Sequence, residues 1–266
     1  MTSPICLFDS GIGGLTVLKK LIDRYPNENY IYLADLARVP FGDKTKEEIK
    51  IIVSEIIDWL VKFNPKIIIM ACNTSSAILS SELQALSSKL QVPIYGMIES
   101  CAKEITKSNY KKISVWATKL VVENNSYKNA IHKMNPNIEI EEIACPKLVP
   151  MIEDLSFPED KKNKIIFEYR DKISKDSEEL ILGCTHYPLI KEDLRKLLKT
   201  KITDPADSLV NDLEKYLLPS NNSSNKKQVA LYSTAQIEKV KIFSKAYLQE
   251  DFKVNQISLN KIKAKI

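Results

Sequence analysis

Ile67-Ile68-Ile69-Met70-Ala71-Cys72-Asn73-Thr74 is the stretch that decides the fold. Its unbroken apolar, mostly β-branched run predicts a strand that is buried on both faces, as in a parallel sheet. Leu180-Ile181-Leu182-Gly183-Cys184-Thr185-His186 has the same form, an apolar run that ends in a small residue, a thiol and polar side chains. Open α/β sheets bind ligands at the carboxyl ends of their strands. The two thiols therefore indicate one site that is used from two sides.

Strand and helix patterns alternate along the rest of the chain. We predict strands at residues 4–8, 30–33, 67–70, 94–96, 113–116, 138–140, 180–182 and 229–233, and helices at residues 14–25, 45–63 and 236–248. Thr45 and Glu48 form a capping box at the start of the second helix, and Asn64-Pro65 ends it. The polar residues 219–225 predict a linker. This order of elements is typical of an α/β protein built from βαβ units.

Composition excludes several classes of protein. The 266 residues carry a formal charge of +5 from scattered lysines, without the arginine and aromatic clusters of a nucleic-acid module. The length allows one large domain or two small ones. No apolar stretch is long enough to cross a bilayer, and the N-terminus lacks the pattern of a signal peptide. We expect a cytoplasmic protein with no nucleic-acid partner and no membrane contact.

The five cysteines are widely spaced and contain no C-x-x-C pair, which argues against zinc ribbons and thioredoxin-like redox sites. We therefore expect no metal. Cys6 and Cys101 are interpreted as buried apolar residues, and Cys145, before Pro146, as structural.

The glycine-rich loop Asp9-Ser10-Gly11-Ile12-Gly13-Gly14 lies between the first strand and the first helix. Thr16 stands where the third glycine of a dinucleotide motif would be, and the loop has no Walker lysine, so nucleotide binding is disfavoured. The loop is expected to direct backbone N–H groups at a carboxylate, with Asp9 held at the strand end and Ser10 donating alongside. Arg38, in the loop after the second strand, is interpreted as structural.

Taken together, six motifs resemble those of glutamate racemases in order and spacing. They are residues 9–14, Ala37-Arg38-Val39-Pro40-Phe41-Gly42, Ala71-Cys72-Asn73-Thr74, Ala144-Cys145-Pro146, Val149-Pro150-Met151-Ile152-Glu153 and Gly183-Cys184-Thr185-His186-Tyr187-Pro188. The last motif separates the chain from the similar aspartate racemases, where a glutamate is usual at the position of His186.

The resemblance implies interconversion of L- and D-glutamate without a cofactor, supplying D-glutamate for peptidoglycan, in an enzyme that is commonly a homodimer. It also implies two pseudo-symmetric flavodoxin-like α/β lobes, each a mostly parallel sheet flanked by helices, with the active site in the cleft between them. We place the first lobe at residues 1–96 plus 206–258, carrying Asp9 and Cys72. The second lobe is expected at residues 97–205, carrying Glu153, Cys184 and His186.

Inversion at an α-carbon without a cofactor needs a base on one face and an acid on the other, and two thiols of similar pKa meet that need. By resemblance, Cys72 with Asp9 would deprotonate D-glutamate, and Cys184 with His186 and Glu153 would deprotonate L-glutamate. The residues implied to hold the substrate are Asp9, Ser10, Phe41, Gly42, Asn73, Thr74, Thr118, Thr185 and His186. Small hydroxyl and amide groups suit short hydrogen bonds to carboxylates.

Other interpretations stay open at this point. The protein could be an aspartate or broader acidic amino-acid racemase, a cysteine hydrolase using Cys184 and His186, or a non-catalytic binder of acidic amino acids. Asn73 and Thr74 could merely cap the helix that follows them. His132 is interpreted as a surface residue.

The chain departs from the family pattern at Val121 and Asn124, where a threonine and a serine are common, so one hydrogen bond to the substrate could be missing. It also begins almost at the first strand. We therefore expect no activation by a cell-wall precursor, which in some relatives is linked to an N-terminal extension.

Overall fold

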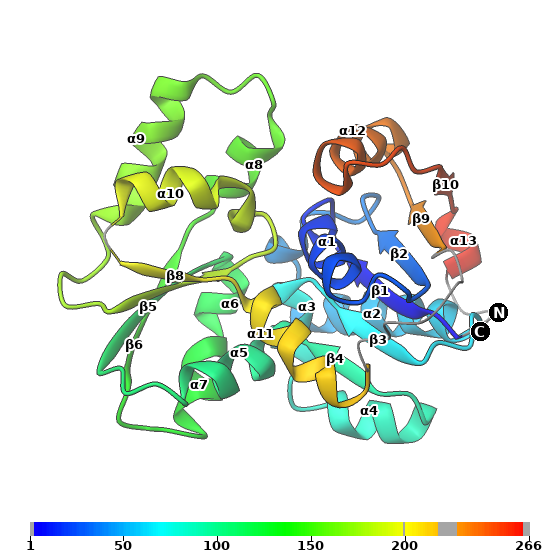
Figure 1. Ribbon diagram of the computed structural model, residues 1–266, viewed down its shortest axis with the longest axis horizontal. Helices are drawn as coiled ribbons and strands as arrows, with labels where there is room; N and C mark the ends of the chain where they lie inside the picture. The colour runs from blue at the N-terminus through cyan, green and yellow to red at the C-terminus, as the bar shows by residue number, and fades with distance from the viewer. Residues whose placement is uncertain (1–2, 199, 218–227, 263–266) are drawn as a thin grey trace.

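The computed structural model describes residues 3–198, 200–217 and 228–262, and it contains two parallel sheets with helices on both faces of each (Figure 1). The predicted linker at residues 219–225 lies outside the described residues. Within the described part of the chain, no helix is long and apolar enough to span a bilayer.

The elements follow one another as strands, α-helices and short 3-10 turns (η). In chain order they are β1 (Ile5–Asp9), α1 (Gly14–Arg24), β2 (Tyr30–Ala34), η1 (Phe41–Asp43), α2 (Lys46–Val61), β3 (Ile67–Met70), α3 (Asn73–Leu79), α4 (Leu83–Leu90), β4 (Ile94–Gly96), α5 (Met97–Ile105), β5 (Lys112–Ala117), α6 (Lys119–Glu123), α7 (Ser126–His132), β6 (Glu139–Ala144), α8 (Leu148–Glu153), α9 (Glu159–Arg170), β7 (Glu179–Gly183), η2 (Tyr187–Ile190), α10 (Lys191–Leu197), β8 (Lys201–Thr203), α11 (Pro205–Asp212), η3 (Leu213–Lys215), β9 (Val229–Ser233), α12 (Ile237–Leu248), β10 (Val254–Gln256) and α13 (Leu259–Ile262).

The larger sheet has six strands in the order β10-β9-β2-β1-β3-β4. Successive side chains of β1 point to opposite faces, so Leu7 packs in the core under α1, α11 and α12, whereas Phe8 packs in the core under α2, α3 and α4. Both are fully buried. Burial on both faces explains why the strands of this sheet consist of continuous apolar runs.

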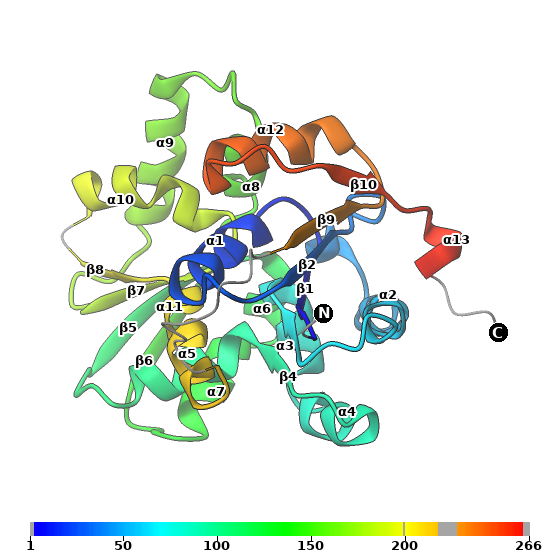
Figure 2. The ribbon, with the colours of Figure 1, turned by 45° about the vertical axis from the view of Figure 1, so that its right-hand side comes forward.

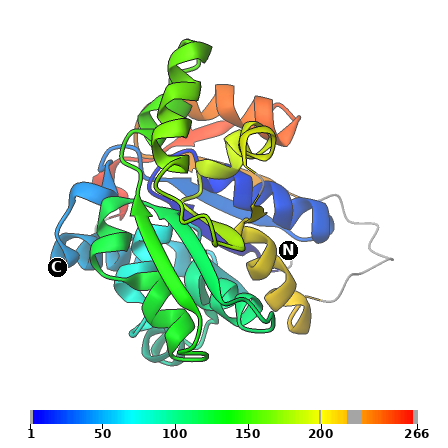
Figure 3. The same ribbon diagram turned by 90° about the vertical axis from the view of Figure 1, so that its left-hand side faces the viewer.

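The smaller sheet has four strands in the order β6-β5-β7-β8, and Figure 3 turns it, in green and yellow, toward the viewer. Its order repeats the run β2-β1-β3-β4 of the larger sheet. In this correspondence β7 takes the place of β3, so Cys72 and Cys184 leave equivalent strands. The predicted pseudo-symmetry of two flavodoxin-like lobes is thus present in the strand order.

Helices α5 and α11 lie between the two sheets (Figure 1). α11 packs against both α1 and α5, and its Ala206 and Leu209 belong to the core of the six-stranded sheet. Cys101 of α5 instead belongs to a core of the four-stranded sheet. These two helices therefore join the lobes along one side of the cleft.

The predicted strands at residues 67–70, 94–96 and 229–233 agree with the structure in both bounds. The capping box is also confirmed, because Thr45 Oγ1 accepts from Glu48 N at 3.2 Å and Glu48 Oε2 accepts from Thr45 N at 2.8 Å. The prediction at residues 138–140 was too short. β6 continues to Ala144 because the carboxylates of Glu141 and Glu142 are bonded, to Ser114 Oγ and to Tyr127 N.

Candidate active site

The two thiols open into one cavity of about 390 Å³, which is lined by residues that follow strands of both sheets. Every residue that the sequence predicted for the site except Asp9 lines this cavity: Ser10, Phe41, Gly42, Cys72, Asn73, Thr74, Thr118, Glu153, Cys184, Thr185 and His186. Cys72 follows β3 and Cys184 follows β7. Their equivalent positions in the two sheets explain how residues so distant in sequence meet in one cleft.

Asp9 lies beneath the cavity and is fully buried. Its Oδ2 accepts from Gly11 N at 2.9 Å, and its Oδ1 accepts from Thr185 Oγ1 at 3.2 Å. The N–H group of Gly11 in the glycine loop therefore bonds the carboxylate of the loop's own Asp9, and the expected contact of the loop with a substrate carboxylate stays a prediction. Burial raises the pKa of Asp9 although the charge of His186 opposes the shift.

The glycine loop has a second property, a close approach to the other lobe. A Cβ atom at Gly13 would lie 2.3 Å from Thr185 Oγ1 and 2.5 Å from His186 Nδ1. Side chains cannot come that close, so only glycine allows this loop to pack against the segment that carries Cys184. The absence of a side chain at Gly13 therefore shapes the cleft, in addition to the N–H groups of the loop.

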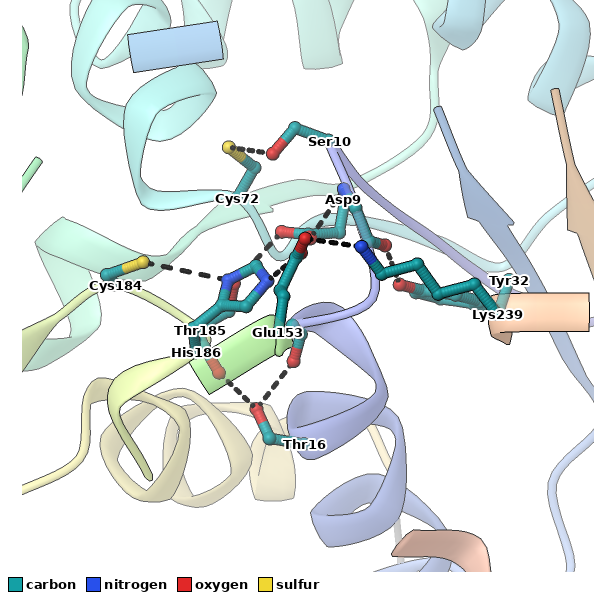
Figure 4. Close-up of polar contacts among 12 residues, drawn as sticks. Asp9, Ser10, Thr16, Tyr32, Cys72, Glu153, Cys184, Thr185, His186 and Lys239 are labelled. Atoms are coloured by element: carbon teal, nitrogen blue, oxygen red, sulfur yellow. Dashed lines mark hydrogen bonds and ion pairs between the residues drawn. The ribbon is translucent and has the colours of Figure 1, made fainter. Parts of the chain in front are cut away.

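On one side of the cavity, the Cys72 thiol donates to Ser10 Oγ across 3.5 Å (Figure 4). Burial raises the pKa of this thiol, and the charge of the neighbouring Asp9 raises it further. Ser10 is thus a direct partner of Cys72, while Asp9 acts on the thiol through charge.

On the other side, Cys184 Sγ lies 3.8 Å from His186 Nδ1, and His186 Nε2 lies 2.8 Å from Glu153 Oε1 (Figure 4). Burial disfavours the charged form of His186, but the hydrogen bonds and charges of Cys184 and Glu153 outweigh it and raise its pKa to about 10. Burial also opposes ionisation of Glu153, yet His186 and Lys239 lower its pKa to about 2. The arrangement favours an imidazolium between the sulfur of Cys184 and the carboxylate of Glu153.

Asn73 and Thr74 are the first two residues of α3, whose N-cap is Cys72. Asn73 Oδ1 accepts from the hydroxyl of Tyr127 at 2.6 Å, and Thr74 Oγ1 lies 3.0 Å from Thr118 Oγ1. These contacts link α3 to α7 and to the exit of β5. Neither Asn73 nor Thr74 is therefore the N-cap, and their side chains instead contact Tyr127 and Thr118.

Sequence reasoning missed two residues that support the site, Tyr127 and Lys239. Lys239 Nζ bonds Glu153 Oε2 at 2.6 Å. Neither residue lies next to a motif, and each reaches the site only through the packing of distant helices. The lining residues Lys119 and Tyr187 were also missed, although Tyr187 stands directly after His186 in a motif.

Two further predictions can be compared with the structure. Arg38 is structural as expected, since it pairs with Asp35 at 2.6 Å and with Glu55. His132 is not a plain surface residue: it is half-buried, and its Nε2 lies 2.8 Å from the carbonyl oxygen of Ile138. Its helix α7 packs against β6, which brings the imidazole onto the chain just before that strand.

Three cysteines take no part in the polar contacts around Cys72 and Cys184. Cys6 and Cys101 are fully buried in apolar cores, as predicted. Cys145 lines the cavity wall, yet it is also fully buried, and its thiol donates to the carbonyl oxygen of Ile143 at 3.4 Å. Among the described residues, no group of three or more His, Cys, Asp and Glu side chains is arranged to hold a metal ion.

The sequence profile of the Asp/Glu/Hydantoin racemase family matches residues 14–213. The chain belongs to this family. Within the Asp/Glu/Hydantoin racemase family it is 36% identical over 261 residues to a glutamate racemase of Fusobacterium nucleatum, covering 96% of this chain and 98% of the relative. It is 40% identical over 265 residues to a glutamate racemase of Prochlorococcus marinus, covering 97% of each protein.

A solved structure of the same racemase family shares the fold. The glutamate racemase of Francisella tularensis, in complex with D-glutamate, superposes with a TM-score of 0.88 at 33% identity, covering 97% of this chain and 98% of that chain. The resemblance found in the six motifs and the predicted two-lobe α/β fold class are both confirmed.

Proposed function

We propose that this chain is a glutamate racemase that inverts the α-carbon of glutamate with Cys72 and Cys184 as its two acid–base groups. The observation that carries the proposal is the presence of both thiols in one cavity, each with its own polar partner. The glutamate racemases of similar sequence and the relative that binds D-glutamate support the choice of substrate.

From D-glutamate, the Cys72 thiolate removes the proton of Cα and becomes a thiol, while the C–H electron pair stays on carbon beside the carboxylate. The thiol of Cys184 then delivers its proton to the opposite face of Cα and becomes a thiolate. The product, L-glutamate, then leaves the site. The reverse reaction begins at Cys184. Each thiol is therefore the base in one direction of the reaction and the acid in the other, as expected for two groups of similar pKa.

The two sides are supported unequally. Cys72 has the hydroxyl of Ser10 and the buried charge of Asp9 near it, whereas Cys184 has the imidazole of His186, itself bonded to Glu153. An imidazolium beside a thiol favours the thiolate electrostatically. We assign Asp9 to assist Cys72, and His186 with Glu153 to assist Cys184.

The substrate is proposed to lie between the thiols, held by the hydroxyl, amide and backbone groups of the lining. These come from Ser10, Phe41, Gly42, Asn73, Thr74, Thr118, Thr185 and His186, with Asp9 beneath them. Donors of fixed direction suit the two carboxylates of glutamate and stabilise charge that spreads into the α-carboxylate during proton removal.

A cysteine hydrolase would need only the pair of Cys184 and His186. The second thiol, Cys72, lies in the same cavity with its own partner, and this observation favours racemisation over hydrolysis. A binding protein without catalysis would need neither thiol.

Free thiols are maintained in reducing compartments, and all five cysteines are free. We therefore place the enzyme in the cytoplasm, where it would supply D-glutamate for peptidoglycan. We keep residues 1–96 plus 206–258 and residues 97–205 as the two lobes, and a homodimer as the assembly. Sedimentation equilibrium of the full chain tests the homodimer.

Incubation of the wild-type chain with each enantiomer in deuterium oxide tests the proposed function. A racemase incorporates deuterium at Cα while the optical rotation decays to zero from either side. Aspartate, tested in parallel, should react far more slowly. Binding of glutamate without Cα exchange, or faster turnover of aspartate, would contradict the proposal.

A further inference from the structure

The site contains a contact that the racemase chemistry above does not use, the ion pair between Lys239 and Glu153. Lys239 Nζ lies 2.6 Å from Glu153 Oε2, while Glu153 Oε1 lies 2.8 Å from His186 Nε2 (Figure 4). His186 Nδ1 in turn faces Cys184 Sγ at 3.8 Å. A single line of contacts therefore runs from an amine on α12 to one of the two thiols.

The ion pair joins the two lobes. Lys239 lies on α12, whose Val240 and Phe243 pack in the core of the six-stranded sheet. Glu153 ends α8, whose Met151 and Ile152 pack in a core of the four-stranded sheet. Figure 2 shows α8 and α12 side by side above the sheets. The contact thus bridges the cleft next to the cavity.

This pair differs from the surface ion pairs of the same helix. The side chains of Lys239 and Glu153 are 27% and 22% exposed, whereas Lys241 and Glu238, which pair within α12, are 43% and 78% exposed. Exposed pairs of the latter kind contribute little to stability. The partly buried pair is screened less by solvent, so its charges act more strongly on their neighbours.

The geometry also fixes the direction of the Glu153 carboxylate. Each of its two oxygens has a different partner, Lys239 on one and His186 on the other. The ionisable groups that face it are Lys239 from α12 and His186 from the segment after β7. The charge of Glu153 also contributes to the raised pKa of Tyr32 on β2, whose main cause is burial. Without Lys239, the carboxylate would keep only one partner and could turn away from the imidazole.

We propose that Lys239 is a positioning residue for the Cys184 half of the reaction, acting through Glu153 and His186 across the cleft. This inference rests on the proposed racemase function. Lys239 does not line the cavity and touches no reacting atom. Its contribution is to hold the carboxylate ionised and aimed, which keeps the imidazole beside Cys184.

The first test compares Lys239→Met with Lys241→Met, which removes a lysine two positions away on the same helix. Lys239→Met should lower kcat about tenfold or more with little change in KM, because hydrogen bonds to charged groups are worth that much. Lys241→Met should match the wild type, and Lys239→Arg should recover most of the lost kcat. Equal kcat in Lys239→Met and wild type, or no recovery with Lys239→Arg, would overturn the inference.

The second test asks whether Lys239 acts through Glu153. In a Glu153→Gln background, Lys239→Met should cause no further loss of kcat, because the carboxylate that it positions is gone. If the two single losses multiply instead, Lys239 acts by another route and the inference is wrong.

The two directions of the reaction provide a check on the measured rates. Because enantiomers have equal free energies in solution, a variant must lower kcat/KM by the same factor for L-glutamate and for D-glutamate.

A readout without substrate separates this inference from the proposed function. The rate at which iodoacetamide alkylates Cys184, followed by peptide mass mapping, should fall severalfold in Lys239→Met while that of Cys72 stays unchanged. Unchanged alkylation of Cys184 would contradict the positioning role. A wild-type chain without Cα exchange would instead refute the racemase proposal, whatever the alkylation rates.

Discussion

Tyr127 Oη donates to Asn73 Oδ1 across 2.6 Å, from α7 beside the four-stranded sheet to α3 beside the six-stranded sheet. Tyr127 is fully buried, and burial raises its pKa well above the ordinary value, so its hydroxyl remains a donor at physiological pH. With Oδ1 occupied, the amide NH2 of Asn73 is the group left to face the cavity. Under the proposed function, this bond would select a donor for a substrate carboxylate.

Tyr127→Phe should raise KM for both enantiomers about fivefold and lower kcat less, because Asn73 is then free to present its oxygen to the substrate. Steady-state kinetics in both directions measure the effect. Tyr30→Phe is the matched control, since Tyr30 is equally buried but its hydroxyl bonds the carbonyl oxygens of Leu21 and Tyr25, away from the cavity. That variant should lose stability and keep the wild-type KM. An unchanged KM in Tyr127→Phe would refute the role given to this bond.

Gly13→Ala should lower kcat about a hundredfold while the fold is retained, because the added methyl group would displace Thr185 and His186 from the cleft. Racemisation assays with circular dichroism measure both properties. Gly96→Ala serves as the comparison, because a Cβ there would meet Leu83 and Ser76 at 3.2 Å, outside the cavity lining. It should cost stability with little loss of activity. Near-wild-type kcat in Gly13→Ala would show that the close approach does not matter for the site.

Stability should depend on pH through His186 and Glu153. Because the folded pKa of His186 is about 10 against an ordinary 6.5, its contribution is complete below pH 6.5 and is lost as pH rises toward 10. The folded pKa of Glu153 is about 2 against an ordinary 4.5, so its contribution is complete above pH 4.5 and is lost as pH falls toward 2. Both contributions are complete only between pH 4.5 and 6.5.

The free energy of unfolding should therefore fall between pH 6.5 and 10 by on the order of 4 kcal/mol more in the wild type than in His186→Gln. Urea denaturation at several pH values measures this difference. Parallel curves for the wild type and His186→Gln would mean that the imidazolium is not held as described.

Local patterns predicted much of the fold. The run at residues 67–70 has no polar residue to blur its bounds, and Thr45 with Glu48 marks a helix start by hydrogen bonds within one turn. β6 was harder, because Glu141 and Glu142 interrupt its apolar residues. Their carboxylates are accommodated by Ser114 and by the backbone of Tyr127, partners that are distant in sequence.

The same distinction separates the predicted site residues from the missed ones. Cys72 and Cys184 follow the ends of strands, and the apolar runs that form these strands can be read from the sequence. Tyr127 and Lys239 contact Asn73 and Glu153 only because α7 and α12 pack next to partners more than fifty residues away in the chain. The role of Gly13 was also hidden, since a glycine in a turn does not reveal which atoms approach it.

The two-thiol mechanism is tested most directly by Cys72→Ser and Cys184→Ser, assayed with each enantiomer in deuterium oxide. Both variants should lose net racemisation by at least a thousandfold, because a serine hydroxyl is a poor base at neutral pH. Cys184→Ser should still exchange the α-proton of D-glutamate, and Cys72→Ser that of L-glutamate, each without inversion. Full racemisation by either variant would contradict the account.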